Sequence, residues 1–162
     1  VALTLRKLLF AASGEAGPRK AGDATPNPFG MVDRKSGLLP SLPDPKTLPS
    51  WLPQHEFDQL VHAFEKSGFT GGLNYYRNLD RNWELQQAHI GQMVSMPALF
   101  MIGERDTGLS IPGMDQIIAA MPSLVPGLRG SHVLDGAGHW LQQERPEEVS
   151  GLLLDFLNTL EN

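Results

Sequence analysis

Apolar residues recur at three- and four-residue intervals along the first half of the chain, the periodicity of a helix with one buried face. The pattern occupies residues 3–13, 53–68 and 70–89. The first stripe is Leu5, Leu8, Leu9 and Ala12, the second is Phe57, Leu60, Val61 and Phe64, and the third is Leu73, Tyr76, Leu79 and Trp83. Pro53 precedes the second stripe and Gly68 follows it, as expected at the two ends of a helix. The sequence therefore predicts three helices before residue 92.

The stretch between Ser13 and Ser50 interrupts this pattern with seven prolines and five glycines. These residues disfavour both helices and strand ladders, so we expect an irregular segment. A loop of this length is unusual in a compact domain. We expect it to cover a binding pocket, to connect parts of an inserted subdomain, or to lie at a subunit contact.

The second half alternates short apolar runs with helical stripes. The run 97–103 suits a strand buried on both faces of a parallel sheet, and residues 131–134 suit a second strand. Two helices are expected after these strands, with stripes formed by Met114, Ile117, Ile118 and Met121, and by Val149, Leu152, Leu153, Phe156 and Leu160. The last helix is expected to begin near Pro146. Strand, helix, strand, helix is the order of an α/β layer.

Composition narrows the class of protein. The 162 residues are 41% hydrophobic, which suits one folded domain, and no apolar run is long enough to cross a bilayer. A net charge of −5 without a basic cluster argues against nucleic acid or an anionic membrane as a partner. The absence of cysteine excludes disulfides and thiolate metal sites and fits a reducing compartment. We expect a cytoplasmic protein without a cofactor.

Two polar residues follow the two predicted strands: Asp106 after the first and His139 after the second. Neighbouring parallel strands bring their carboxyl ends together, so these side chains can lie within hydrogen-bonding reach. An aspartate that accepts the Nδ1 proton would fix the tautomer and leave Nε2 as a general base. Glu104 is the alternative acid, and His132, inside the strand, is expected to be structural. Taken singly, Asp106 also suits a turn or capping residue and His139 an ordinary loop residue.

A metal site or a nucleophile in this chain is less well supported. His132, Asp135 and His139 are close in sequence, but a strand followed by a glycine turn does not put them on one helical face, and no His-Glu-x-x-His spacing occurs. No Gly-x-Ser-x-Gly elbow occurs. If the Asp106–His139 pair is catalytic, its nucleophile lies outside these residues.

Three motifs together resemble the C-terminal half of epoxide hydrolases of the soluble type, which have the α/β-hydrolase fold. "KSGFTGGLNYYRNLDRNWEL" is similar to the cap segment that carries one of the family's two epoxide-polarising tyrosines, here matched to Tyr76. "PALFMIGERD" resembles the strand and turn of the family's acid, matched to Asp106, and "DGAGHWLQQERPEEV" resembles the turn of its base, matched to His139. The resemblance covers residues 54–160 and, more loosely, the first helix.

The resemblance implies a two-step reaction. An aspartate outside this chain opens the epoxide to a covalent ester while cap tyrosines bind the oxygen, and the His/Asp pair then activates water to release a vicinal diol. Tyr75, Trp83 and Trp140 are weaker candidates for contacts with the substrate. The implied division is a helical cap or lid segment in residues 1–92, including the 13–50 loop, and the C-terminal part of the α/β core in residues 93–162.

The rest of the family's fold has no counterpart in these residues. A two-stranded remnant of a parallel sheet would leave an unpaired strand edge and an exposed apolar face. We therefore expect this chain to pair with the missing N-terminal half and to be inactive without it, with a homodimer as a second arrangement. The substrate is expected to be a small epoxide.

Two other functions stay open. A haloalkane or haloacetate dehalogenase, or another α/β hydrolase, would share the acid and histidine turns but has no need of Tyr76. A non-catalytic interaction module would instead use the fold's exposed edge to bind a partner.

Overall fold

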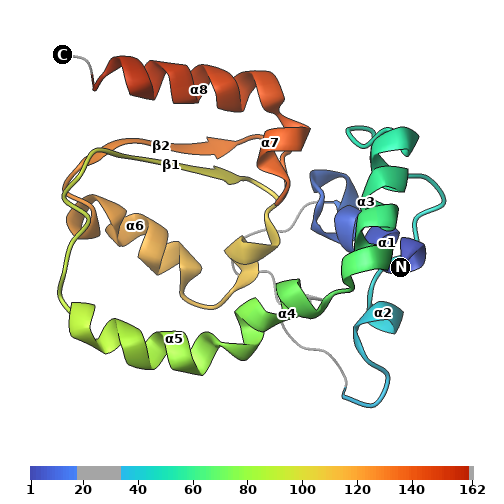
Figure 1. The fold of residues 1–162 in the computed structure, drawn as a ribbon. Helices are drawn as coiled ribbons and strands as arrows, with labels where there is room; N and C mark the ends of the chain where they lie inside the picture. Colours follow the sequence, from blue (N-terminus) through green and yellow to red (C-terminus); the bar gives the residue numbers. More distant parts are fainter. Residues whose placement is uncertain (18–33, 161–162) are drawn as a thin grey trace.

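A computed structural model describes residues 1–17 and 34–160, and places two adjacent strands at its centre (Figure 1). Strand β1 (Ala98–Gly103) pairs in parallel with β2 (Leu128–Leu134), and Gly103 lies opposite Leu134 at their carboxyl ends. Helix α6 (Met114–Leu124) connects the two strands. The predicted parallel pair is confirmed.

Helices lie on both sides of the strand pair, with α8 (Pro146–Asn158) on one side and α6 on the other (Figure 1). A buried cluster joins β2 and the loop after it to α8 and consists of Leu134, Ala137, Leu141 and Val149, with Met101 and Leu152 against it. Helix α8 begins at Pro146 as predicted, and Glu147 and Glu148 occupy its first turn, where negative charge is favourable.

A second group of helices lies beside the carboxyl ends of the strands (Figure 1). Helix α1 (Ala2–Ala12) and α3 (Gln54–Ser67) share a cluster of Leu5, Leu52 and Phe57. Pro53 caps α3 at its start, and Gly68 ends it with a φ of 66°, a conformation that glycine adopts without strain. Both helices follow the predicted stripes.

The prediction of a single helix over residues 70–89 is wrong in one respect, because the structure divides this segment into two helices and a 3-10 turn. Helix α4 (Thr70–Arg77) ends at Asn78, α5 (Leu79–Gln86) follows, and a 3-10 turn covers Gln87–His89. The side-chain amide of Asn78 donates to the carbonyl of Asn74 at 2.7 Å, and its backbone N–H donates to the same oxygen. Asparagine competes in this way with the helical backbone pattern and bends the chain.

Three further details differ from the sequence-based expectations. The proline-rich stretch is not wholly irregular, since it holds a 3-10 turn (Gly14–Ala16) and the short α2 (Leu38–Ser41), while its residues 18–33 lie outside the described part. A short helix, α7 (Leu141–Glu144), follows the histidine turn and was not predicted. Strand β1 is half-buried except at Gly103, because the sheet formed by the described residues has only two strands.

The segment from residue 70 to 97 is exposed along its whole length. Its large apolar side chains are Leu73, Tyr75, Tyr76, Leu79, Trp83, Leu85, Ile90, Met93, Val94 and Met96. The apolar stripe of α4 and α5 therefore faces solvent in this chain rather than a core.

Within residues 1–17 and 34–160, no helix is both long and apolar enough to cross a membrane.

Candidate functional site at the carboxyl ends of the strands

Asp106 and His139 lie beside each other where the two strands end. Asp106 follows β1 and begins a 3-10 turn (Thr107–Ser110), in which its Oδ1 accepts the N–H of Gly108 at 2.7 Å. His139 follows β2, five residues after Leu134. The expectation that parallel strands would bring these side chains within hydrogen-bonding reach agrees with the structure.

The His139 ring uses one nitrogen toward the carboxylate. Its Nδ1 lies 3.2 Å from Oδ2 and 3.3 Å from Oδ1 of Asp106. An ionised carboxylate only accepts hydrogen bonds, so Nδ1 carries the proton and Nε2 of the neutral ring is left as the basic atom. The side chain of Asp106 is 14% exposed and that of His139 is 53% exposed. The carboxylate of Asp106 is therefore shielded from solvent, while the imidazole ring of His139 that it contacts stays accessible.

The two groups shift each other's titration. Burial would raise the pKa of Asp106, but the hydrogen bond from His139, the N–H of Gly108 and the charge of His139 together lower it. The hydrogen bond to Asp106 raises the pKa of His139, burial opposes it, and the charges of Asp106 and Glu144 raise it further. Both shifts favour an ionised aspartate and make the imidazole a stronger base.

Backbone contacts fix the loop that carries His139, residues 135–140, which we call the histidine loop. The N–H of Arg105 donates to Ala137 O at 2.8 Å, which ties the turn of residues 104–106 (the acid turn) to this loop. Gly136 has a φ of 66°, which lets the chain turn sharply out of β2. A Cβ on Gly138 would overlap the backbone of Ala12 to Gly14. The His139 N–H donates to Ala12 O at 2.8 Å, so the end of α1 supports the base directly.

Glu144 is a site residue that the sequence analysis missed. Its carboxylate accepts backbone N–H groups from Gly14 at 2.9 Å, Gly138 at 3.0 Å and Trp140 at 3.2 Å. The only local signal is a glutamate at the last of the four residues of a short helix. The contact with Gly14 spans 130 positions, and no spacing rule predicts it.

The aromatic candidates on α4 and α5 lie apart from the pair. Tyr75, Tyr76 and Trp83 are 80%, 73% and 67% exposed, and among the described residues no hydrogen bond or ring contact joins them to Asp106 or His139. The structure therefore brings two of the three main candidates together and leaves Tyr76 on an exposed helix.

Trp140 lies directly beside the base. Its ring meets the His139 ring edge-on with centroids 5.2 Å apart, and a tilted contact joins it to Trp51 at 6.4 Å. Its Nε1 donates to Leu9 O at 2.8 Å, so its polar atom is already used within the chain. Leu9, Trp51 and Trp140 also line a groove between α1, α3 and α7.

The remaining candidates have other contacts. Glu104 accepts the N–H of Gly136 at 3.0 Å, so Asp106 and not Glu104 is the partner of His139. His132 lies within β2 opposite Met101. In the part of the chain that the structure describes, no three His, Asp or Glu side chains gather as metal ligands, His132, Asp135 and His139 included.

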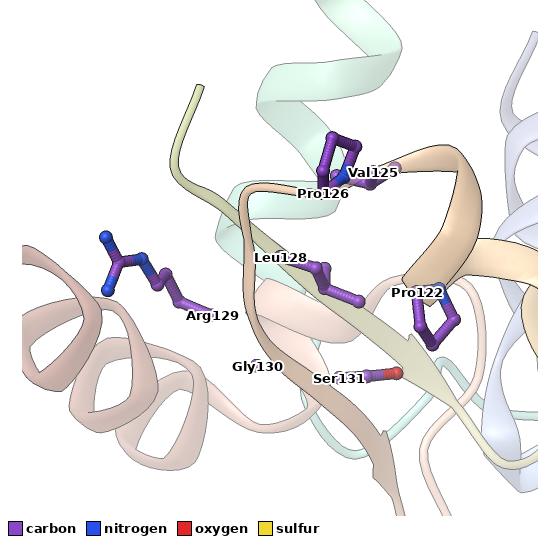
Figure 2. A pocket seen from close by; sticks show the side chains of 7 residues that line it. All are labelled: Pro122, Val125, Pro126, Leu128, Arg129, Gly130 and Ser131. Atoms are coloured by element: carbon purple, nitrogen blue, oxygen red, sulfur yellow. The ribbon is translucent and has the colours of Figure 1, made fainter. Parts of the chain in front are cut away.

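A separate hollow lies at the other end of β2 (Figure 2). Figure 2 shows its lining at the end of α6 and the start of β2, formed by Pro122, Val125, Pro126, Leu128, Arg129, Gly130 and Ser131. Leu128 pairs with Ala98 at the amino ends of the strands, opposite the end that leads to Asp106 and His139. The hollow is therefore not part of the candidate site.

Comparisons with known proteins identify relatives over nearly the whole chain. Epoxide hydrolase A of Mycobacterium tuberculosis is 40% identical over 167 residues, which cover 99% of this chain and 47% of that protein. Epoxide hydrolase 1 of Siraitia grosvenorii is 36% identical over 133 residues, covering 78% of this chain and 42% of that protein. No family model matches the sequence.

Solved structures agree with these relatives. An epoxide hydrolase from an endophytic Streptomyces superposes with a TM-score of 0.86 at 37% identity, over 99% of this chain and 46% of that one. Potato (Solanum tuberosum) epoxide hydrolase I superposes with a TM-score of 0.73 at 40% identity, over 80% of this chain and 41% of that one. The chain spans a little under half the length of these proteins. It is therefore a homologue of the epoxide hydrolases of the α/β-hydrolase fold and corresponds to part of that fold.

Proposed function

We propose that this chain supplies the water-activating half of an epoxide hydrolase that converts small epoxides to vicinal diols. The observation that carries the proposal is the Asp106–His139 pair at the carboxyl ends of adjacent parallel strands, in a chain whose relatives are named epoxide hydrolases. Ligands of open α/β sheets bind at this edge. The nucleophile is an aspartate outside these residues.

In the proposed reaction, a carboxylate oxygen of that aspartate attacks an epoxide carbon and the C–O bond of the ring breaks. The phenol of Tyr76 donates a hydrogen bond to the oxygen as it gains charge and gives it a proton. Nε2 of His139 then removes a proton from water, and the resulting hydroxide attacks the ester carbonyl. The ester C–O bond breaks, the imidazolium gives its proton to the diol oxygen, and the carboxyl group left on the aspartate releases the second water proton, which restores the phenol of Tyr76. Asp106 stabilises the imidazolium between the two transfers.

The chain is proposed to consist of two parts with different roles. Residues 1–92 form a helical cap segment with the 13–50 loop, and residues 93–162 form the C-terminal part of the core. Tyr75, Trp83 and Trp140 are proposed to contact the substrate, and the principal partner is the remaining part of the fold, with a homodimer as a second arrangement. A cytoplasmic location stays the prediction of the cysteine-free sequence.

Complementation tests the proposal. The chain would be combined with a separately expressed N-terminal part of Epoxide hydrolase A of Mycobacterium tuberculosis, upstream of the matched region, and diol formation would be assayed. We expect activity from the mixture and none from either part. In a mixture carrying His139→Gln, mass spectrometry should detect the ester accumulating on the N-terminal part, because its hydrolysis needs the base. Diol formation by the 162 residues alone would contradict the proposal.

The substrate class is tested at Tyr76. In the active mixture, Tyr76→Phe removes the phenolic proton and should slow epoxide opening by roughly 100-fold or more. Tyr75→Phe on the same helix keeps the ring that is proposed to contact the substrate, and it should slow epoxide opening far less than Tyr76→Phe. Retained turnover of haloalkanes or haloacetates by Tyr76→Phe, with no epoxide turnover by the unsubstituted mixture, would favour the dehalogenase alternative.

A further inference from the structure

The carboxylate of Glu144 joins two segments that are far apart in the sequence. Its Oε2 accepts the N–H of Gly14 at 2.9 Å and the N–H of Gly138 at 3.0 Å, and lies 3.5 Å from the Ser13 hydroxyl. Its Oε1 accepts the N–H of Trp140 at 3.2 Å. Gly138 and Trp140 are the two neighbours of His139. One side chain therefore holds the backbone on both sides of the base.

We propose that Glu144 is a positioning residue that holds the histidine loop against the end of α1 and so keeps the His139 ring on Asp106. The inference rests on the proposed function insofar as His139 acts as a base. That the Glu144 carboxylate fixes the histidine loop does not depend on any activity of the chain. Hydrogen bonds from N–H groups to a carboxylate are among the stronger ones in proteins, and three of them converge here.

The surrounding contacts hold the histidine loop closely against α1. His139 N–H donates to Ala12 O at 2.8 Å, and Trp140 Nε1 donates to Leu9 O at 2.8 Å, so α1 contacts the loop beside the Glu144 bonds. The backbones of Gly14 and Gly138 approach too closely for a Cβ on either residue. Removal of the carboxylate would leave half-buried N–H groups without an acceptor in this tight contact, which is costly.

The same carboxylate contributes to the electrostatics of the base. The charged groups around the loop are Asp106 and Arg105 from the acid turn, Glu104 at Gly136, Arg145 after α7, and Glu144 itself. Arg105 donates to Gly14 O at 3.1 Å, and Arg145 donates to Asp135 O at 3.1 Å. The negative charge of Glu144 adds to that of Asp106 in raising the pKa of His139. Loss of Glu144 is therefore expected to alter both the placement and the titration of the ring.

The test uses NMR on the full chain and needs no activity. Glu144→Gln keeps the side-chain volume, removes the charge and turns an N–H₂ toward one of the donors. We expect the pKa of His139 to fall and the Gly138 and Trp140 amides to exchange with solvent roughly tenfold faster. Glu148→Gln, which removes a charge from the exposed first turn of α8, is the control and should leave both readouts unchanged.

Glu144→Ala removes every acceptor and should exaggerate both effects. If Glu144→Ala does not fold, the near-isosteric Glu144→Gln decides the question. An unchanged His139 pKa together with unchanged exchange at Gly138 and Trp140 in Glu144→Gln would overturn the proposal. An effect on exchange without any change of the His139 titration would also overturn it, since a purely structural role predicts that result.

Complementation separates this inference from the proposed function. In an active mixture, Glu144→Gln should lower kcat roughly tenfold or more with little change in KM, because the base and not the substrate is displaced. If the mixture is inactive but the NMR effects occur, the proposed function fails and the positioning role stands. If the mixture is active and Glu144→Gln changes neither kcat nor the NMR readouts, only the positioning role fails.

Discussion

Asp106 determines which nitrogen of His139 is protonated. The carboxylate faces Nδ1 through both of its oxygens, at 3.2 and 3.3 Å, and its own orientation is fixed by the N–H of Gly108. An amide in its place can present either a donor or an acceptor to the ring. The tautomer of His139 therefore depends on this side chain, which is also the largest cause of its raised pKa.

Asp106→Asn should lower the pKa of His139, since it removes the hydrogen bond and charge that raise it. The titration of the His139 ring by NMR checks this in the chain itself. In a complemented enzyme the same change should slow ester hydrolysis by roughly 100- to 10,000-fold. Asp155→Asn, on the exposed face of α8, is the control and should change neither value. A His139 pKa that does not move would contradict the assigned contact.

The pair should also make stability depend on pH in a defined window. The pKa of Asp106 is lowered on folding, so its contribution is present above its ordinary value and is lost as the pH falls through the folded value. The pKa of His139 is raised, so its contribution is complete below its ordinary value and is lost as the pH rises through the folded value. Both contributions are fully present between about pH 4 and 6.5.

We therefore expect His139→Gln to lower the Tm most within this window and progressively less at higher pH. Thermal unfolding of the two proteins between pH 3 and 9 provides the measurement. The exposed His55→Gln is the control and should give a difference that does not follow the same profile. A His139→Gln penalty that increases toward pH 9 would contradict the direction of the shift.

At the scale of elements, glycines permit the contact between the end of α1 and the histidine loop. The backbone of Gly138 lies against Ala12 to Gly14, and a side chain there would force the two segments apart. Gly103, at the end of β1, makes a similar close approach to the carbonyls of Ala137 and Gly138. The placement of His139 therefore depends on backbone packing between elements as well as on side-chain bonds.

Gly138→Ala should destabilise the chain by about 1–3 kcal/mol, the usual cost of inserting a methyl group into a packed contact. Gly151→Ala is the matched control, because Gly151 lies in α8 with nothing near its Cβ position. That change should stabilise the protein by about 0.5–1 kcal/mol through helix propensity. Urea unfolding of both variants measures the difference, and an unchanged midpoint for Gly138→Ala would show that the contact is looser than described.

Elements with a repeated apolar pattern were predictable from the sequence, but a helix break and a very short helix were not. Apolar stripes located α1, α3 and α8, and a continuous apolar run located β1. The stripe through residues 70–89 continues across Asn78, so periodicity could not detect the break that this side chain causes. Helix α7 has only four residues, too few for any periodicity. A short-range side-chain hydrogen bond caused the first miss, and the short length of the helix caused the second.

The described part of the molecule exposes extensive apolar surface. The side chains of Leu79, Trp83 and Ile90 are 61%, 67% and 74% exposed, and Val133 on β2 is 60% exposed. Both strands also have an edge with no neighbour in the described sheet. Extensive apolar patches mark interaction surfaces. The relatives are about twice as long, and the proposed pairing with the remaining part of the fold would cover this surface.

The chain alone should therefore self-associate or bind an apolar dye, and addition of the N-terminal part should reduce both. Sedimentation and dye fluorescence measure these effects. Replacing Leu79 and Trp83 with glutamate should reduce dye binding and weaken complementation, whereas Gln86→Glu adds a charge to the same exposed helix and should do neither. A chain that is monomeric at high concentration and does not bind the dye would contradict this expectation and favour a self-sufficient module.

The sequence by itself determined two neighbouring parallel strands, most helices and the candidate acidic residues and histidine that follow the strands, because periodicity and position after a strand are local properties. It also carried the resemblance that implied the role of Tyr76. Only the tertiary structure decided that Asp106 rather than Glu104 meets His139, and that Glu144 and the end of α1 hold the histidine loop. These contacts join residues up to 130 positions apart, and their geometry depends on how the elements pack.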